Sequence, residues 1–161
     1  MSRSRGILTK VRSEFLAHAI SGRVLTQEAS DYESIRRGLV WNGRPPEHYP
    51  RVIVEAHSAA DVVRCINFAR HYGLTVYVRG TGHSYSAIFL RDGGLLLDLA
   101  QLDDIVVDKI SRQVSVGAGA RSGQINAILV QEGLAFPVGH DANVGIGGST
   151  PEPPKFPVRD F

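Results

Sequence analysis

The 161-residue chain is poor in the residue types that mark secreted or membrane proteins. It has one cysteine, Cys65, so no disulfide can form within the chain, which is compatible with a reducing compartment. It has no apolar run long enough for a membrane span, and its basic opening, residues 1–5, is not followed by the apolar run of a signal peptide. We therefore expect a cytoplasmic protein with no membrane partner. A transit peptide, suggested by the same basic opening, is the alternative.

The chain also lacks a large excess of positive or negative charge. Lysine and arginine total 18 against 16 for aspartate and glutamate, and the arginines are scattered along the chain. A nucleic-acid-binding surface usually gathers its basic residues into a patch, so we expect no nucleic-acid partner. The histidines show no metal-ligand spacing with one another or with Cys65, which argues against a metal site. Small molecules are the expected partners.

The most informative stretch is residues 76–85, where a β-prone run leads directly into Gly80 and Gly82. Glycine accepts positive φ and lets a ligand approach the backbone, so successive N–H groups of this loop can face one anion. His83 follows at once, at the rim of whatever the loop holds. The loop is neither a Rossmann fingerprint nor a P-loop, and spacing alone leaves ordinary turn glycines as an equal alternative.

Single residues near this loop have simpler interpretations too. A histidine is most often a hydrogen-bonded structural residue, and a cation at a strand end, such as Arg79, is most often solvated. An aromatic at a loop end, such as Tyr85, most often packs in the core. Asp98 is expected to be a solvated carboxylate at a strand end. Beside an anion-binding loop, however, the His83 imidazole could be a nucleophile toward a cofactor, a proton relay or a donor to a phosphate.

A strand, a helix and a second strand are predicted between residues 51 and 78. The first strand is a β-branched run at residues 51–55, and the second covers residues 74–78. Between them, Ser58 is a good N-cap and Gly73 a good helix stop. Because the joints are short, the two strands are predicted to be parallel, with a right-handed crossover.

Further elements are predicted on both sides of this unit. They are helices at residues 13–20 and 30–39, a buried strand at 95–99, a hairpin of residues 105–107 and 113–117, and a helix capped by Ser122. The expected division of the chain is a helical lead-in at residues 1–45, a domain at 46–148 and a tail at 149–161. The tail holds four prolines in a short span and is expected to be disordered, because proline cannot donate to a β-ladder.

Four motifs in a fixed order resemble the N-terminal FAD-binding half of the vanillyl-alcohol-oxidase superfamily. They lie at residues 78–84, 93–99, 116–119 and 144–148. The berberine-bridge-enzyme-like oxidases are the members that the chain resembles most, and the resemblance runs from about residue 40 to residue 148. It implies an α+β fold in which a small mixed sheet with packed helices forms the first lobe of a PCMH-type FAD-binding domain.

The resemblance also implies a cofactor site. FAD would lie with its diphosphate on the backbone amides of the first glycine-rich loop and with its ring and ribityl chain along the second loop, residues 139–148. His83 matches the histidine that many members bond covalently to the flavin 8α-methyl carbon. Asp141 stands where bicovalent members have a cysteine, so one covalent link at most is expected. The implied cofactor-binding residues are Arg79, Gly80, Thr81, Gly82, His83, Ser84, Tyr85, Gly139, Asn143, Val144, Gly145, Gly147 and Gly148.

The full-length relatives are oxidases and dehydrogenases that pass a hydride from an alcohol, a sugar or an amine to FAD, so the resemblance implies a small-molecule substrate. Family members continue beyond the position of Gly148 into a second FAD lobe and a substrate domain, which hold the catalytic base. We therefore expect an incomplete enzyme and assign no catalytic residue. The alternative is a truncated, non-catalytic fragment that acts at most as an FAD-binding or interaction module and self-associates through an uncovered apolar face.

Overall fold

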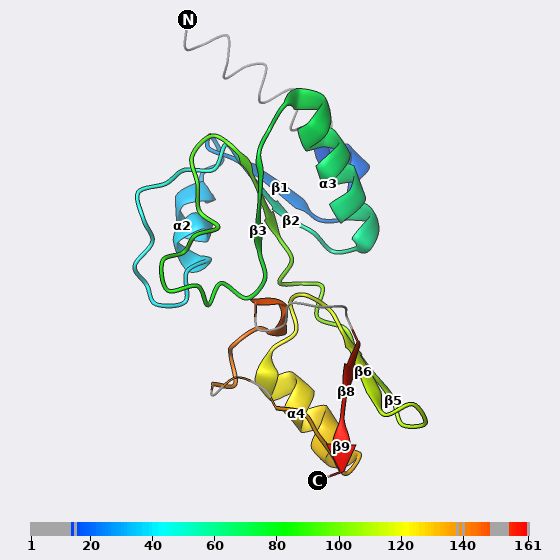
Figure 1. Ribbon diagram of the computed structural model, residues 1–161. Helices are drawn as coiled ribbons and strands as arrows, with labels where there is room; N and C mark the ends of the chain where they lie inside the picture. The colour runs from blue at the N-terminus through cyan, green and yellow to red at the C-terminus, as the bar shows by residue number, and fades with distance from the viewer. Residues whose placement is uncertain (1–13, 15, 138, 140, 149–154, 161) are drawn as a thin grey trace, which may run out of the picture.

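The computed structural model describes residues 14, 16–137, 139, 141–148 and 155–160, which form two lobes (Figure 1). The first lobe contains a four-stranded sheet in the order β1-β2-β4-β3. The second contains a three-stranded sheet in the order β5-β6-β8 and the pair β7-β9. The strands are β1 Arg23–Thr26, β2 Val52–Glu55, β3 Val76–Arg79, β4 Leu95–Asp98, β5 Ile105–Asp108, β6 Gln113–Val116, β7 Leu134–Ala135, β8 Lys155–Pro157 and β9 Arg159–Asp160. The helices are α2 Tyr32–Gly38, α3 Ala59–Tyr72 and α4 Ser122–Gln131, with a short 3₁₀ helix, η1, at Ile146–Gly148.

The sheet of the first lobe is mixed, as predicted. β2 and β3 are joined through α3 and run parallel, but β4 lies between them and pairs with both. β4 is buried along its whole length, as its three consecutive leucines, residues 95–97, predict for a strand between two parallel neighbours. β1 was not predicted; it pairs antiparallel with β2, and its Leu25 is buried.

The two faces of this sheet are covered by different elements. α2 and α3 lie on opposite sides of the strands in Figure 1, and the alternation of side chains along β2 follows them. Val52 and Val54 pack in a cluster with Cys65 of α3, while Ile53 packs in a cluster with Tyr32 of α2. Both faces of the sheet are therefore buried, and its strand ends are left for the loops that carry the site.

α3 begins and ends as its sequence predicts. The Ser58 hydroxyl accepts a hydrogen bond from the Asp61 backbone N–H at 3.1 Å, and Gly73 ends the helix with a φ of 62°. The buried Asp61 carboxylate also accepts from the Ser21 backbone and hydroxyl, at 3.0 and 2.8 Å, and from the His57 N–H at 3.0 Å. Burial alone would raise the pKa of Asp61, but these hydrogen bonds outweigh it and bring the pKa down to about 2.

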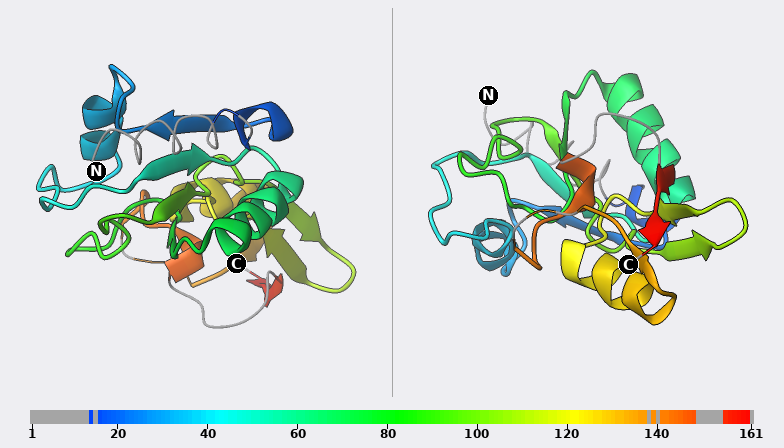
Figure 2. Two further views of the ribbon diagram at one scale, coloured as in Figure 1. Left: turned by 90° about the horizontal axis from the view of Figure 1, so that it is seen from above. Right: turned by 60° about the horizontal axis from the view of Figure 1, so that its bottom comes forward.

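The second lobe confirms the predicted hairpin and shifts the predicted helix cap. β5 and β6 pair antiparallel, and the hairpin projects to one side of the molecule in both views of Figure 2. α4 begins at Ser122, with Arg121 at the N-cap position. The Ser122 hydroxyl is not a cap, because it donates to the carbonyl of Val144 at 2.9 Å. This serine therefore ties α4 to the second glycine-rich loop.

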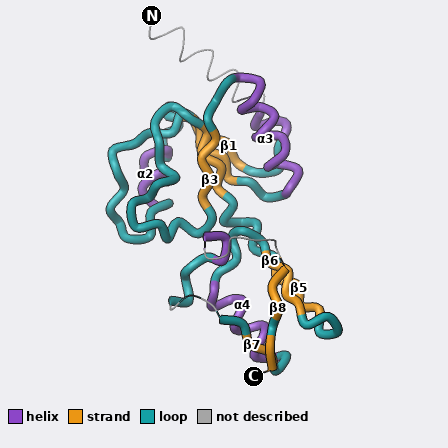
Figure 3. The backbone as a smooth tube through the Cα atoms, viewed as in Figure 1, coloured by secondary structure: helices purple, strands orange, loops and turns teal. Residues whose placement is uncertain are grey.

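Residues 155–160 correct the expectation of a disordered tail. β8 pairs antiparallel with β6, and β9 pairs with β7 (Figure 3). β8 is at the edge of its sheet, where the missing N–H of Pro157 costs no interior ladder bond. Val158, between the two strands, is 4% exposed and belongs to the same apolar cluster as Ile125 and Leu129 of α4. The rest of the predicted tail, 149–154 and 161, lies outside the described residues.

Candidate cofactor-binding site

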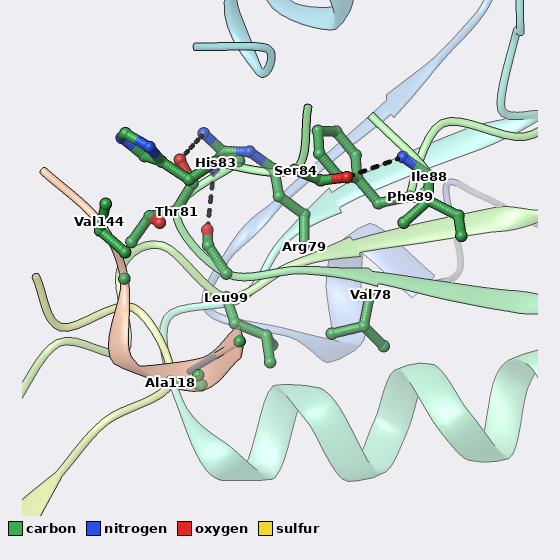
Figure 4. Close-up of a pocket in the computed structure, with 15 residues that line it drawn as sticks. Val78, Arg79, Thr81, His83, Ser84, Ile88, Phe89, Leu99, Ala118 and Val144 are labelled. Atoms are coloured by element: carbon green, nitrogen blue, oxygen red, sulfur yellow. Dashed lines mark hydrogen bonds between the residues drawn. The ribbon is translucent and has the colours of Figure 1, made fainter. Parts of the chain in front are cut away.

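A cavity of about 580 Å³ lies where the two lobes meet (Figure 4). Residues 78–84 line it from the first lobe, and the second glycine-rich loop lines it from the other side. The structure thus brings the two glycine-rich loops together around one space. Ten of the predicted residues line this cavity: Arg79, Gly80, Thr81, Gly82, His83, Ser84, Val144, Gly145, Gly147 and Gly148.

Three predicted residues do not line the cavity. Tyr85 is 78% exposed, and Gly139 and Asn143 precede the part of the second loop that faces the space. The Asn143 carbonyl instead accepts from the Arg121 guanidinium at 3.2 Å. Ala118 does line the cavity and was not assigned to the site, although the motif at residues 116–119 already pointed to this turn.

The Arg79 side chain fixes the conformation of the first glycine-rich loop by binding its carbonyl groups. Its guanidinium forms an ion pair with Asp98 at 2.7 Å and donates to the carbonyls of Leu39, Gly80 and Thr81 at 3.0, 3.2 and 3.3 Å. Arg79 is 8% exposed and Asp98 6%, so neither is the solvated strand-end charge that local sequence suggests. The pairing is non-local, because β3 and β4 place the two residues side by side in register.

The loop's carbonyls therefore face the guanidinium, which fixes the direction of its amides. In a trans peptide the C=O and the N–H point in opposite directions, and the described residues contain no cis peptide. The N–H groups of Thr81 and Gly82 must then point away from Arg79. Within the described residues, no hydrogen bond uses the backbone N–H groups of residues 80–86. A run of unpaired amides around a glycine with a φ of 79° is the backbone arrangement that binds anions.

Glycines allow the two lobes to approach closely at the cavity. A Cβ on Gly145 would overlap the side chain of Thr81. A Cβ on Gly80 or on Gly147 would lie 2.9 Å from the Ala118 carbonyl oxygen. Side chains at these positions would push the loops apart, so the glycines set the width of the cavity.

The second loop is held against the start of α4. The Val144 carbonyl accepts from both the backbone N–H and the hydroxyl of Ser122, each at 2.9 Å. The Ile146 N–H donates to the Ala120 carbonyl at 3.0 Å. These bonds place residues 144–148 opposite the first loop.

His83 lies at the rim of the cavity and is partly exposed. Its imidazole stacks on the Trp41 indole, with ring centroids 4.9 Å apart and planes at 7°. Neither ring nitrogen forms a hydrogen bond to another residue in the described part of the chain. It is therefore not held by hydrogen bonds as a structural histidine there, and its nitrogens are available to a ligand.

Comparison with known proteins decides what this site belongs to. Residues 50–151 match a family model described as FAD binding domain, which is more than half of the chain. The chain belongs to this FAD-binding domain family. The match spans both glycine-rich loops and the strands that precede them, so the family assignment rests on the same residues as the cavity.

Individual proteins with similar sequences are consistent with this family assignment. The chain is 32% identical over 131 residues to an uncharacterized FAD-linked oxidoreductase, YgaK, of Bacillus subtilis, covering 81% of the chain and 28% of the relative. It is 31% identical over 130 residues to (R)-6-hydroxynicotine oxidase of Paenarthrobacter nicotinovorans, covering 81% and 28%. The chain thus spans between a quarter and a third of the length of these curated relatives.

Solved structures show the same fold. The BBE-like 1 protein of Physcomitrella patens superposes with a TM-score of 0.73 at 28% identity, covering 85% of this chain and 29% of that one. The predicted architecture, a small mixed sheet with packed helices as in a PCMH-type FAD-binding domain, is therefore confirmed. FAD is the cofactor of this family.

The residues present fit FAD. A diphosphate requires several N–H donors and no nearby carboxylate, and residues 80–86 offer such amides. Among the described residues that line the cavity there is no aspartate or glutamate, and the Asp98 carboxylate is neutralised by Arg79. Within the described residues there is no cluster of His, Cys, Asp or Glu that could hold a metal ion, and no helix long and apolar enough to cross a membrane.

Proposed function

We propose that this chain is the FAD-binding portion of a flavin-linked oxidoreductase of the berberine-bridge-enzyme-like type, acting on an alcohol, a sugar or an amine. The observation that carries the proposal is the run of unpaired amides that begins at Gly80, in the loop whose residues 80–84 line one cavity together with the second glycine-rich loop. The similarity to (R)-6-hydroxynicotine oxidase supports an amine as one substrate class, since a hydroxynicotine is an amine.

The residues of the cavity have separate tasks in this proposal. The amides after β3 would donate to the diphosphate, while Arg79 holds the Gly80 and Thr81 carbonyls turned away from it. Val144, Gly145, Gly147 and Gly148, which line the cavity from the second loop, would border the ring and the ribityl chain. When bound, FAD supplies the acceptor for the hydride. The chain's own residues bind and orient it.

His83 is the proposed point of covalent attachment. It lies at the rim, its ring nitrogens have no partner among the described residues, and it directly follows the amides that would hold the diphosphate. A nucleophile must be unpaired and close to its target, and among the described histidines His83 is the one that lines the cavity.

The test is flavin fluorescence after denaturation. The purified chain, denatured in acid and run on a gel, should show a band that fluoresces under ultraviolet light. His83→Ala should abolish that fluorescence, whereas His71→Ala, at the exposed end of α3, should leave it unchanged. A dark wild-type band would refute the covalent link, and fluorescence retained in His83→Ala would assign it to another residue.

A second candidate is a non-catalytic module that holds FAD and self-associates. The observation in its favour is apolar surface beside the cavity, where Val78 and Ile88 are 53% and 60% exposed. Size-exclusion chromatography with light scattering over a range of concentrations separates the two. A concentration-dependent dimer that Val78→Ser abolishes supports the module, and a monomer at all concentrations removes the self-association.

We also propose a cytoplasmic location and a cofactor-binding unit at residues 46–148, to which residues 155–160 add β8 and β9. Cys65 is compatible with this location, since it is a free thiol in the structure; burial raises its pKa to about 11, which makes it unreactive. Cell fractionation with an antibody to the chain tests the location. Recovery in a secreted or organellar fraction would overturn it.

A further inference from the structure

We propose that Trp41 is a positioning residue that holds the His83 imidazole in the orientation for bonding to the flavin. The inference rests on the proposed function of His83. Trp41 lies in the loop after α2, more than 40 positions away from His83 in the sequence, and nothing in the sequence pattern linked the two residues. In the structure their rings are stacked and nearly parallel, with centroids 4.9 Å apart and planes at 7°.

The segment that carries Trp41 is fixed to the first glycine-rich loop on both sides of the stack. Before it, the Leu39 carbonyl accepts from Arg79 Nε at 3.0 Å and lies so close to Gly82 that a Cβ there would overlap it. After it, Asn42 Nδ2 donates to the Tyr85 carbonyl at 3.2 Å. The two segments therefore run side by side, and the stack follows from their backbone contacts.

Tyr85 supports the indole from another side. Its ring meets the Trp41 ring edge to face, with centroids 5.4 Å apart and planes at 85°. The indole is thus held between the imidazole and the phenol, in the two arrangements that aromatic pairs prefer. Trp41 remains 45% exposed, so the contact serves the rim of the cavity and not the core.

The stack determines what the imidazole presents to a ligand. An unrestrained histidine side chain samples several staggered rotamers, and only some of them point a ring nitrogen at a given atom. Trp41 covers one face of the His83 ring and leaves its edge, with both nitrogens, free of hydrogen bonds to the described residues. Restricting the ring in this way removes part of the entropy cost of reaching the reactive geometry.

Formation of the bond between His83 and the flavin is a two-electron oxidation, for which dioxygen is the oxidant. An imidazole nitrogen loses its proton and bonds to the 8α carbon of the flavin, which loses one C–H hydrogen as a second proton. The electron pair of that C–H bond passes through the flavin ring to dioxygen, which leaves with the two protons as hydrogen peroxide. Trp41 exchanges no atom or electron in this sequence.

The experiment measures the rate of covalent attachment separately from FAD affinity. Flavin-free chain is mixed with FAD in air, and samples are denatured at intervals to measure the covalently bound flavin by its fluorescence. FAD affinity is measured separately at equilibrium in His83→Ala and in His83→Ala/Trp41→Ala, which cannot form the link to His83. Trp41→Ala should slow attachment by about threefold to tenfold, the range that one aromatic stack supplies, with FAD affinity within about twofold. Trp41→Phe, which keeps a ring, should restore most of the rate.

The control is Ile110→Ala, an exposed apolar residue of the β5–β6 turn, which should behave as wild type. Far-UV circular dichroism verifies that each variant is folded. Attachment in Trp41→Ala at the wild-type rate would overturn the inference, as would a loss of FAD affinity equal to the loss of rate, since Trp41 would then bind the cofactor directly. No attachment in the wild type would instead refute the proposed role of His83, a result that no Trp41 variant can produce.

Discussion

At the scale of single residues, the site depends on charges whose partners are distant in sequence. Asp98 was expected to be solvated because a carboxylate at a strand end usually is, yet it is buried against Arg79. Local sequence cannot reveal this, because the pairing exists only once β3 and β4 lie in register. The glycines and His83 could be recognised from sequence because their spacing is local. The contact of His83 with Trp41 could not.

Replacing Arg79 should destabilise the whole chain. Arg79→Met leaves the Asp98 carboxylate buried without a counter-charge, which costs about 3–5 kcal/mol of the free energy of unfolding. Urea denaturation measures this change. Arg23→Met is the matched control, because Arg23 pairs with Asp31 at the surface and should cost less than about 1 kcal/mol. Equal costs for the two variants would contradict the role of Arg79.

Asp61 should make stability depend on acid pH. Its pKa in the folded chain is about 2, below the ordinary 3.8, so the ionised carboxylate stabilises the fold above about pH 4 and this contribution is lost as the pH falls toward 2. The shift corresponds to about 2 kcal/mol. Asp61→Asn should be less stable than wild type at pH 7, with the difference shrinking between pH 4 and pH 2. Urea titrations at several pH values measure it, and a constant difference would contradict the assignment.

At the scale of secondary-structure elements, strands with an apolar run could be predicted from the sequence, and the edge strands β1 and β8 could not. β2, β3, β4 and the β5–β6 hairpin follow from apolar runs and turn residues. β1 and β8 have ordinary local sequences and become strands because an existing strand offers them an open edge. The prolines at residues 151–157 led to the prediction of a disordered tail. A proline is tolerated at the edge of a sheet, but local sequence does not reveal that β8 lies at an edge.

The first glycine-rich loop should depend on Gly82 more than on other glycines with positive φ. Gly82→Ala combines a left-handed backbone with a Cβ that overlaps the Leu39 carbonyl, so it should weaken FAD binding by about tenfold or more. Gly93→Ala has the same backbone strain but open space around its Cβ, and should leave FAD affinity unchanged. Isothermal titration with FAD measures both. Equal affinities for the two variants would show that the loop geometry at Gly82 is not needed.

The chain segment at residues 155–160 should contribute to stability. Val158→Ala removes buried apolar surface from the second lobe and should lower the free energy of unfolding by about 1–2 kcal/mol. Val106→Ala, at a position 64% exposed on β5, should change it by less than about 0.5 kcal/mol. Thermal or urea unfolding compares the two. No effect of Val158→Ala would mean that β8 and β9 do not pack in solution.

At the scale of the whole molecule, the two lobes form one binding site. The α+β architecture, the parallel unit and the two loops were predictable because the family's motifs occur in order along the sequence. The cavity itself was not, because its width is set by glycine contacts between lobes, such as Gly145 against Thr81. The chain spans 28% of the length of two curated relatives. The proposed oxidoreductase activity therefore belongs to a longer protein than the cofactor site described above.

The most direct measurement of the central claim uses Trp41, the one tryptophan of the chain, which stacks on His83 at the rim of the cavity. Flavin absorbs at the wavelengths where tryptophan emits, so FAD held between the loops must quench this emission. We predict saturable quenching when FAD is titrated into His83→Ala, which cannot form the covalent link, and its loss in His83→Ala/Gly82→Ala. Tryptophan emission that falls only in proportion to the light absorbed by free FAD would contradict the claim that these loops bind the cofactor.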